Sequence, residues 1–203
     1  STEGGMGQSI MTKDTPASET AKFTLLPVAK VLVPDGSREV VPGSGEVGMV
    51  AQGGMVPLGY YKDPEKSAKT FKEVDGKRYA FIGDMATVEA DGTINLLGRG
   101  SNCINTGGEK VFPEEVEEAL KLHADVADAL VFGLEDERFG NRVAGVVSLE
   151  QGGSAEAADI LEATRKLLAS YKLPKDLLVV PVVPRAPNGK ADYKTAKSMM
   201  TGD

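Results

Sequence analysis

The sequence predicts an α+β protein in two parts. Residues 1–98 are expected to form a strand-rich region with a distorted, β-barrel-like sheet, and residues 99–203 a small α+β domain. Short apolar runs separated by glycine and proline turns fill the first region, whereas strand and helix patterns alternate in the second. The change coincides with Gly100 and Ser101, where small residues give the backbone freedom, so the boundary is placed there.

The first region contains one helix pattern among its strands. Asp63 suits the capping position and Pro64 the first helical position, which predicts a short helix ending near Phe71. Asp91-Gly92 is typical of a hairpin turn between two strands. The expected strands are residues 28–33, 46–51, 79–82, 86–89 and 93–97.

The second region begins with a hairpin around Gly107-Gly108, after which Pro113 starts a helix whose first turns are rich in glutamate. A second helix is expected over residues 155–170 and a third through Met200. These helices are expected to pack on a sheet. The expected strands are residues 103–105, 110–112, 126–134, 143–149 and 177–183.

The composition excludes several classes of protein. The chain has 23 basic and 30 acidic residues and a net charge of -7, without a dense basic cluster, which argues against nucleic acid as a partner. A single cysteine, Cys103, excludes an intrachain disulfide and is expected to pack as a small apolar residue in a strand, in a reducing cytosol. The most apolar run, residues 177–183, is too short to span a membrane. A cytoplasmic protein is therefore expected.

Three charged residues in order along the chain are candidates for nucleotide chemistry. Asp84 follows Gly83 at the expected end of a strand, Arg99 follows a glycine, and Lys190 follows the turn Pro187-Asn188-Gly189. A carboxylate, a guanidinium and an ammonium match the hydroxyl and phosphate groups of ATP. Each alone is more often a solvated residue of a surface turn, and only their occurrence together favours a site.

The residues also resemble a known family. The stretch Tyr79 to Asp84, the block GRGSNCINTGGEKVFPEEVEEAL from Gly98 to Leu120, and Pro187 to Lys190 are similar to signature motifs of the adenylate-forming enzymes. These include acyl-CoA and aryl-CoA synthetases, luciferases and peptide-synthetase adenylation domains. Gly45-Glu46-Val47-Gly48 and Gly59-Tyr60-Tyr61 are also similar to family segments. The resemblance covers nearly the whole chain.

The resemblance implies roles for several residues. Ser1-Thr2-Glu3 resembles the end of a phosphate motif, in which Thr2 would contact phosphate and Glu3 would bind Mg²⁺. Asp84 would bind the ribose hydroxyls of ATP with help from Arg99. Lys190 would stabilise the adenylation transition state.

The family also implies a moving carboxy-terminal domain. Its hinge position falls on Ser101, where relatives usually carry Asp or Lys. After the movement, the Gly107-Gly108 turn would face the pantetheine arm of CoA, because a glycine lets the ligand approach closely.

The resemblance implies the carboxy-terminal part of an AMP-forming acyl-CoA ligase for a fatty acid or related carboxylic acid. Residues 1–98 would be the truncated end of the large adenylating domain. The phosphate loop and acyl pocket of the family have no counterpart in the sequence, so the chain alone is expected to be inactive. The alternatives are an aryl-acid or luciferase-like adenylating enzyme and a non-catalytic module with the same fold. Because acylation would remove the charge of Lys190, a lysine acyltransferase is a further expected partner.

Overall fold

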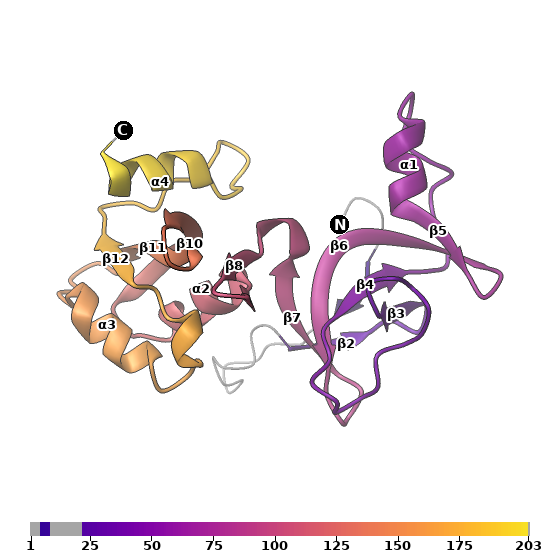
Figure 1. Ribbon diagram of the computed structural model, residues 1–203, viewed down its shortest axis with the longest axis horizontal. Coiled ribbons are helices and arrows are strands. Elements are labelled where there is room, and N and C mark those ends of the chain that lie inside the picture. Colours follow the sequence, from indigo (N-terminus) through magenta and orange to yellow (C-terminus); the bar gives the residue numbers. More distant parts are fainter. Residues whose placement is uncertain (1–4, 9–21, 203) are drawn as a thin grey trace. The chain divides into compact units, whose positions relative to one another are not determined.

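A computed structural model describes residues 5–8 and 22–202 of the chain (Figure 1). The chain divides into two compact units, Ser1–Ser101 and Asn102–Asp203. Within the described ranges, no helix is long and apolar enough to cross a membrane. The mixed α+β class that the sequence predicts is confirmed: among the described residues, the first unit has seven strands and one α-helix, and the second has five strands and three α-helices.

The first unit is built on an antiparallel sheet of seven strands in the order β1-β2-β7-β6-β4-β3, with β5 also paired to β6. The long strand β6 makes this arrangement possible, because β5 pairs with its beginning and β7 with its end, along one side. Figure 1 shows β6 as a strongly curved ribbon. The strands are β1 (Gly7–Gln8), β2 (Lys22–Leu25), β3 (Ala29–Leu32), β4 (Gly48–Gln52), β5 (Phe71–Val74), β6 (Lys77–Val88) and β7 (Ile94–Arg99).

Both faces of this sheet are apolar. Val31 and Val50 belong to one buried cluster, while their chain neighbours Leu32 and Ala51 belong to another. Because successive side chains of a strand point to opposite faces, the sheet is covered on both sides.

The only α-helix described in the first unit, α1 (Pro64–Thr70), begins as the sequence predicts. The Asp63 side chain accepts a hydrogen bond from the Lys66 backbone at 3.0 Å, and Pro64 occupies the first turn. The cap and the fixed φ of proline therefore set the start of α1.

The second unit is a sheet covered by helices on both faces. Strands β10 (Val126–Asp136) and β11 (Gly140–Leu149) are antiparallel, and β12 (Asp176–Val179) is parallel to β11. Helices α2 (Pro113–Lys121) and α3 (Ala157–Thr164) pack on one face through Val116, Leu120 and Ile160, while α4 (Tyr193–Thr201) packs on the other through Ala196. A separate hairpin joins β8 (Ile104–Thr106) to β9 (Glu109–Val111).

Four expectations need correction. The strands expected at residues 79–82 and 86–89 belong to one continuous strand, β6. Helix α3 ends at Thr164 rather than near residue 170. The Lys166 and Leu167 N–H groups donate to carbonyls three residues back, which is the 3-10 pattern and not the α-helical one. Strand β12 ends before Pro181, which has no N–H for the ladder. Cys103 precedes β8 instead of lying in it, and it is half-buried, with burial raising the pKa of its thiol.

Candidate functional site

Asp84 and Arg99 lie directly opposite each other on β6 and β7. The Arg99 Nε is 3.0 Å from the Asp84 Oδ1, and the Asp84 side chain is 14% exposed against 54% for Arg99. The Asp84 carboxylate is thus mostly buried, whereas the Arg99 guanidinium is exposed to solvent. This charge-assisted contact favours an orientation in which the two side chains face each other.

Asp84 does not end a strand, as the sequence suggested, but lies within β6 at a bulge. Between the pairs Met49–Met85 and Ala51–Phe81, one residue of β4 faces three residues of β6. Gly83 in this bulge has φ +90°, which glycine adopts without a steric penalty. Because the residues on both sides of Gly83 pair with β4 or β7, the positive φ produces a bulge here instead of a turn, and the bulge presents Asp84 next to Arg99.

Lys190 lies in the second unit, on a hairpin between β12 and α4. Gly189 N–H donates to the Ala186 carbonyl at 2.8 Å and Ala186 N–H donates to the Lys190 carbonyl at 2.8 Å. Gly189 has φ +78°, which a turn at this point requires. The Lys190 side chain is exposed, and within the described part of the chain its ammonium has no ion-pair partner.

The Gly107-Gly108 turn joins β8 to β9 in the second unit. Both glycines have positive φ, +59° and +91°. Gly107 N–H donates to the Phe139 carbonyl at 2.9 Å, and a Cβ at Gly107 would lie 3.1 Å from the Phe139 ring, whereas a Cβ at Gly108 would meet open space. The turn thus packs against Phe139 at Gly107, whereas Gly108 faces open space.

The remaining predicted site residues are Ser101, Thr2 and Glu3. Ser101 lies in a short 3-10 helix, Gly100–Asn102, and it is the last residue of the first unit. Thr2 and Glu3 lie outside the described residues. Asp84 and Arg99 are therefore brought together within one unit, while Lys190 and the Gly107-Gly108 turn belong to the other.

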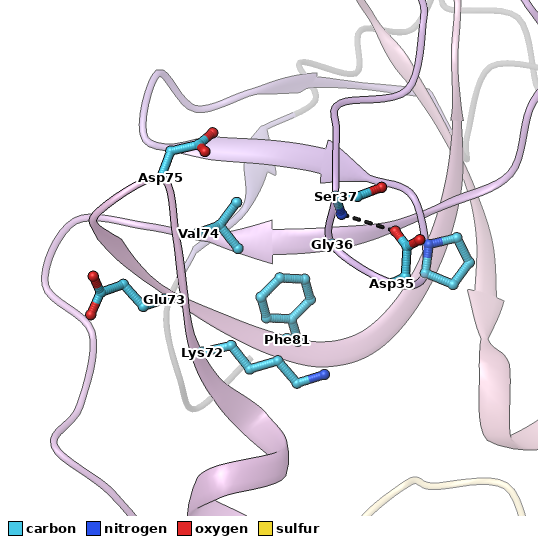
Figure 2. A pocket seen from close by; sticks show the side chains of 9 residues that line it. Asp35, Gly36, Ser37, Lys72, Glu73, Val74, Asp75 and Phe81 are labelled. Atoms are coloured by element: carbon cyan, nitrogen blue, oxygen red, sulfur yellow. Dashed lines mark hydrogen bonds between the residues drawn. The ribbon is translucent and has the colours of Figure 1, made fainter.

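A cavity of about 240 Å³ in the first unit contains none of these residues (Figure 2). Figure 2 shows the Phe81 ring among the side chains that line the cavity, near Val74 and Lys72. The Asp35 carboxylate accepts a hydrogen bond from Ser37 N–H at 2.9 Å, and the Lys72 ammonium lies 5.4 Å from the centre of the Phe81 ring. Over the described ranges, no three His, Cys, Asp or Glu side chains gather as a metal site.

Sequence reasoning missed a charged cluster beneath the Lys190 hairpin. Arg185 donates to both carboxylate oxygens of Asp128 at 2.7 Å. This bidentate contact holds the pKa of Asp128 below its usual range. A charged residue within the apolar strand 126–134 was the signal that could have indicated a partner.

Glu117 of α2 lies beside this pair. Its Oε1 accepts a hydrogen bond from Val131 N–H at 2.9 Å. Burial raises the pKa of Glu117 to about 7, and nearby Glu114 adds to the shift, while Lys121 and Arg185 oppose it. Burial also raises the pKa of Tyr193 on α4. Glu117 is therefore about half protonated near pH 7, whereas Tyr193 is neutral there.

Comparison with known proteins identifies the class. A family model for the AMP-binding enzyme C-terminal domain matches residues 115–190. The chain is 47% identical over 194 residues to 3-oxocholest-4-en-26-oate–CoA ligase of Rhodococcus rhodochrous, covering 96% of the chain and 34% of that protein. It is 48% identical over 200 residues to a medium/long-chain-fatty-acid–CoA/3-oxocholest-4-en-26-oate–CoA ligase of Mycolicibacterium smegmatis, covering 98% of the chain and 36% of that protein.

Solved structures agree with these relatives. ATP-bound MatB from Rhodopseudomonas palustris superposes with a TM-score of 0.70 at 30% identity, over 85% of the chain and 34% of that protein. The chain belongs to the adenylate-forming enzymes and corresponds to a carboxy-terminal portion of one. It spans about a third of the length of the curated relatives that it matches.

Proposed function

We propose that the protein containing this chain is an AMP-forming acyl-CoA ligase for fatty acids or related carboxylic acids, such as steroid side-chain acids. The observation that carries the proposal is the high identity, 47% and 48%, to two ligases named for such acids. The paired Asp84 and Arg99 and the exposed Lys190 supply, in order, the groups that this chemistry needs.

In the first half-reaction, a carboxylate oxygen of the acid attacks the α-phosphorus of ATP. The bond between the α-phosphorus and the oxygen that bridges to the β-phosphorus breaks, and pyrophosphate leaves with that oxygen. Two anions must approach, so a cation near the forming bond lowers the barrier. Lys190 takes this role, since its ammonium is exposed at the tip of a turn. Asp84 would accept the ribose hydroxyls and Arg99 would hold Asp84 in place.

In the second half-reaction, the CoA thiol loses a proton to solvent and its sulfur attacks the acyl carbon. The bond between the acyl carbon and the phosphate oxygen breaks, and AMP leaves with that oxygen. The Gly107-Gly108 turn would border the pantetheine arm, because Gly108 leaves open space where a side chain would otherwise stand. Thr2 and Glu3 would contact phosphate and Mg²⁺, whose charge would offset that of the phosphates.

Replacing Lys190 tests this assignment in the full-length protein. We expect Lys190→Ala to lower acyl-adenylate formation about 100- to 1,000-fold, because a preorganised charge at the transition state is lost. CoA-thioester formation from supplied acyl-adenylate should change little. ATP–pyrophosphate exchange with medium-chain, long-chain, steroid side-chain and aryl acids measures the first step, and thioester release measures the second.

The matched control is Lys197→Ala, which removes another exposed lysine, from α4. Its rates should equal those of the wild type. An unchanged adenylation rate in Lys190→Ala would favour a non-catalytic module, and preference for aryl acids would favour the aryl-acid alternative.

The exposed amine also suggests how the enzyme is regulated. Acylation of Lys190 by a lysine acyltransferase would remove its charge and so stop adenylation, while the thioester step continues. Measurement of both half-reactions on full-length protein acetylated at Lys190 tests this. Loss of the thioester step alone would contradict it.

A further inference from the structure

The Lys190 hairpin, residues 185–191, is joined to the sheet through the side chain of its first residue. An isolated β-bridge between Arg185 and Ala191 closes the hairpin. From this closed end, the Arg185 guanidinium reaches Asp128 on β10 with Nε and Nη2, each 2.7 Å from a carboxylate oxygen. Its Nη1 is 3.4 Å from the Gly189 carbonyl, within the turn that carries Lys190. One side chain thus contacts both the sheet and the turn.

Asp128 is itself well fixed. Its Oδ1 accepts a hydrogen bond from Ala129 N–H at 2.9 Å, so the carboxylate is tied to the backbone of β10. The side chains of Arg185 and Asp128 are 38% and 28% exposed, so water screens the charges of this pair in part, and its geometry is what distinguishes it. A planar guanidinium that binds both oxygens of a carboxylate allows one orientation, which a lysine ammonium cannot specify.

We propose that Arg185 and Asp128 are positioning residues for adenylation: their contact sets where the Lys190 ammonium is held. Neither side chain needs to touch ATP or the acid. The inference rests on the proposed function, in which Lys190 acts at the transition state. A displaced ammonium would lower the rate of the first half-reaction and leave ATP affinity nearly unchanged, because a misplacement of about 1 Å can cost about 100-fold in rate.

The first test needs no activity and uses the full-length protein. Asp128→Asn removes the bidentate contact at nearly constant size, and Arg185→Gln removes it from the other side with a shorter, uncharged side chain. We expect the amides of Ala186 and Gly189, which close the turn, to exchange with deuterium about 10-fold faster in either variant. Amides of β10 and β11 should keep their wild-type rates and so show that the fold is intact.

The matched control is Arg142→Gln. Arg142 also forms an ion pair within the second unit, with its Nε 2.6 Å from the Asp176 Oδ2, but this pair joins β11 to β12 and does not contact the hairpin. Exchange at Ala186 and Gly189 should be unchanged in this variant. Equal acceleration in Arg142→Gln would mean a general loss of stability and would overturn the inference.

The second test measures kinetics in the full-length protein. We expect Arg185→Gln and Asp128→Asn to lower kcat for ATP–pyrophosphate exchange about 10- to 100-fold, with little change in the KM for ATP. Thioester formation from supplied acyl-adenylate should stay at the wild-type rate. The double variant should be no slower than the slower single variant, since both changes remove one contact.

The outcomes separate the two proposals. If wild-type protein forms no acyl-adenylate, the proposed function is wrong, and the role of Arg185 and Asp128 in adenylation is wrong with it. If wild-type protein is active and both variants match it, only the positioning inference fails. Multiplied losses in the double variant, or a rise in the KM for ATP without a fall in kcat, would likewise overturn that inference.

Discussion

At the scale of single residues, Glu117 links the stability of the second unit to pH. Its folded-state pKa is raised from 4.5 to about 7, mainly by burial. Between these values the folded state keeps a proton that the unfolded state has released, so stability falls as pH rises through this window. A shift of this size corresponds to about 3 kcal/mol. The charged and titratable groups around Glu117 are Glu114, Lys121, Arg185 and Tyr193.

We therefore expect Glu117→Gln to remove much of this dependence. The amide can still accept the hydrogen bond from Val131 but cannot ionise. The variant should be the more stable protein near pH 8, by up to about 3 kcal/mol, and close to the wild type near pH 5. Urea unfolding followed across this range measures the difference. Glu162→Gln, at an exposed carboxylate on α3, serves as the control, and equal pH slopes in Glu117→Gln and the wild type would refute the argument.

At the scale of elements, the close approach of β3 to the start of β4 depends on Gly48. A Cβ there would lie 2.5 Å from the Val40 Cγ2 and 2.7 Å from the Leu32 carbonyl oxygen. Backbone and buried side chains would have to move, because neither neighbour is a flexible side-chain end. The sequence placed Gly48 in a family-like segment, and the packing of β3 against β4 gives the physical reason for a glycine at this position.

We expect Gly48→Ala to destabilise the first unit by about 3 kcal/mol, the cost of overpacking a core. Gly76→Ala is the control, since Gly76 also lacks a side chain but has open space around it. Its positive φ of +69° should cost about 1 kcal/mol. Urea unfolding of both variants compares them, and equal losses would show that crowding at Gly48 does not matter.

The elements also show what the sequence can predict. The start of α1 and the turns at Asp91-Gly92 and Gly107-Gly108 were predictable, because neighbouring residues determine them. The bulge at Gly83 was not, since a positive φ suits both a turn and a bulge, and pairing with β4 and β7 decides between them. The Arg185–Asp128 contact joins residues 57 apart in sequence, so no local pattern could assign that partner.

At the scale of the whole molecule, the proposed site residues are shared between two compact units. Asp84 and Arg99 belong to the first and Lys190 to the second, so adenylation would need both units. The units meet in sequence at Ser101 and Asn102, where the chain forms the 3-10 helix Gly100–Asn102. Ser101 is the position at which the family resemblance places the hinge. If the two half-reactions need different arrangements of the units, the backbone at this position must change its angles between them.

Proline at the hinge tests this requirement in the full-length protein. Its ring fixes φ near −65°, which suits a 3-10 helix and forbids large rotation about that bond. We expect Ser101→Pro to keep one half-reaction within about threefold of the wild type and to slow the other at least about tenfold, because one backbone conformation is retained and the other is excluded. ATP–pyrophosphate exchange and thioester formation from supplied acyl-adenylate measure the two separately. Ser101→Ala, which leaves φ free, should preserve both rates. An equal change of both half-reactions in Ser101→Pro would show that rotation at Ser101 does not separate the two steps.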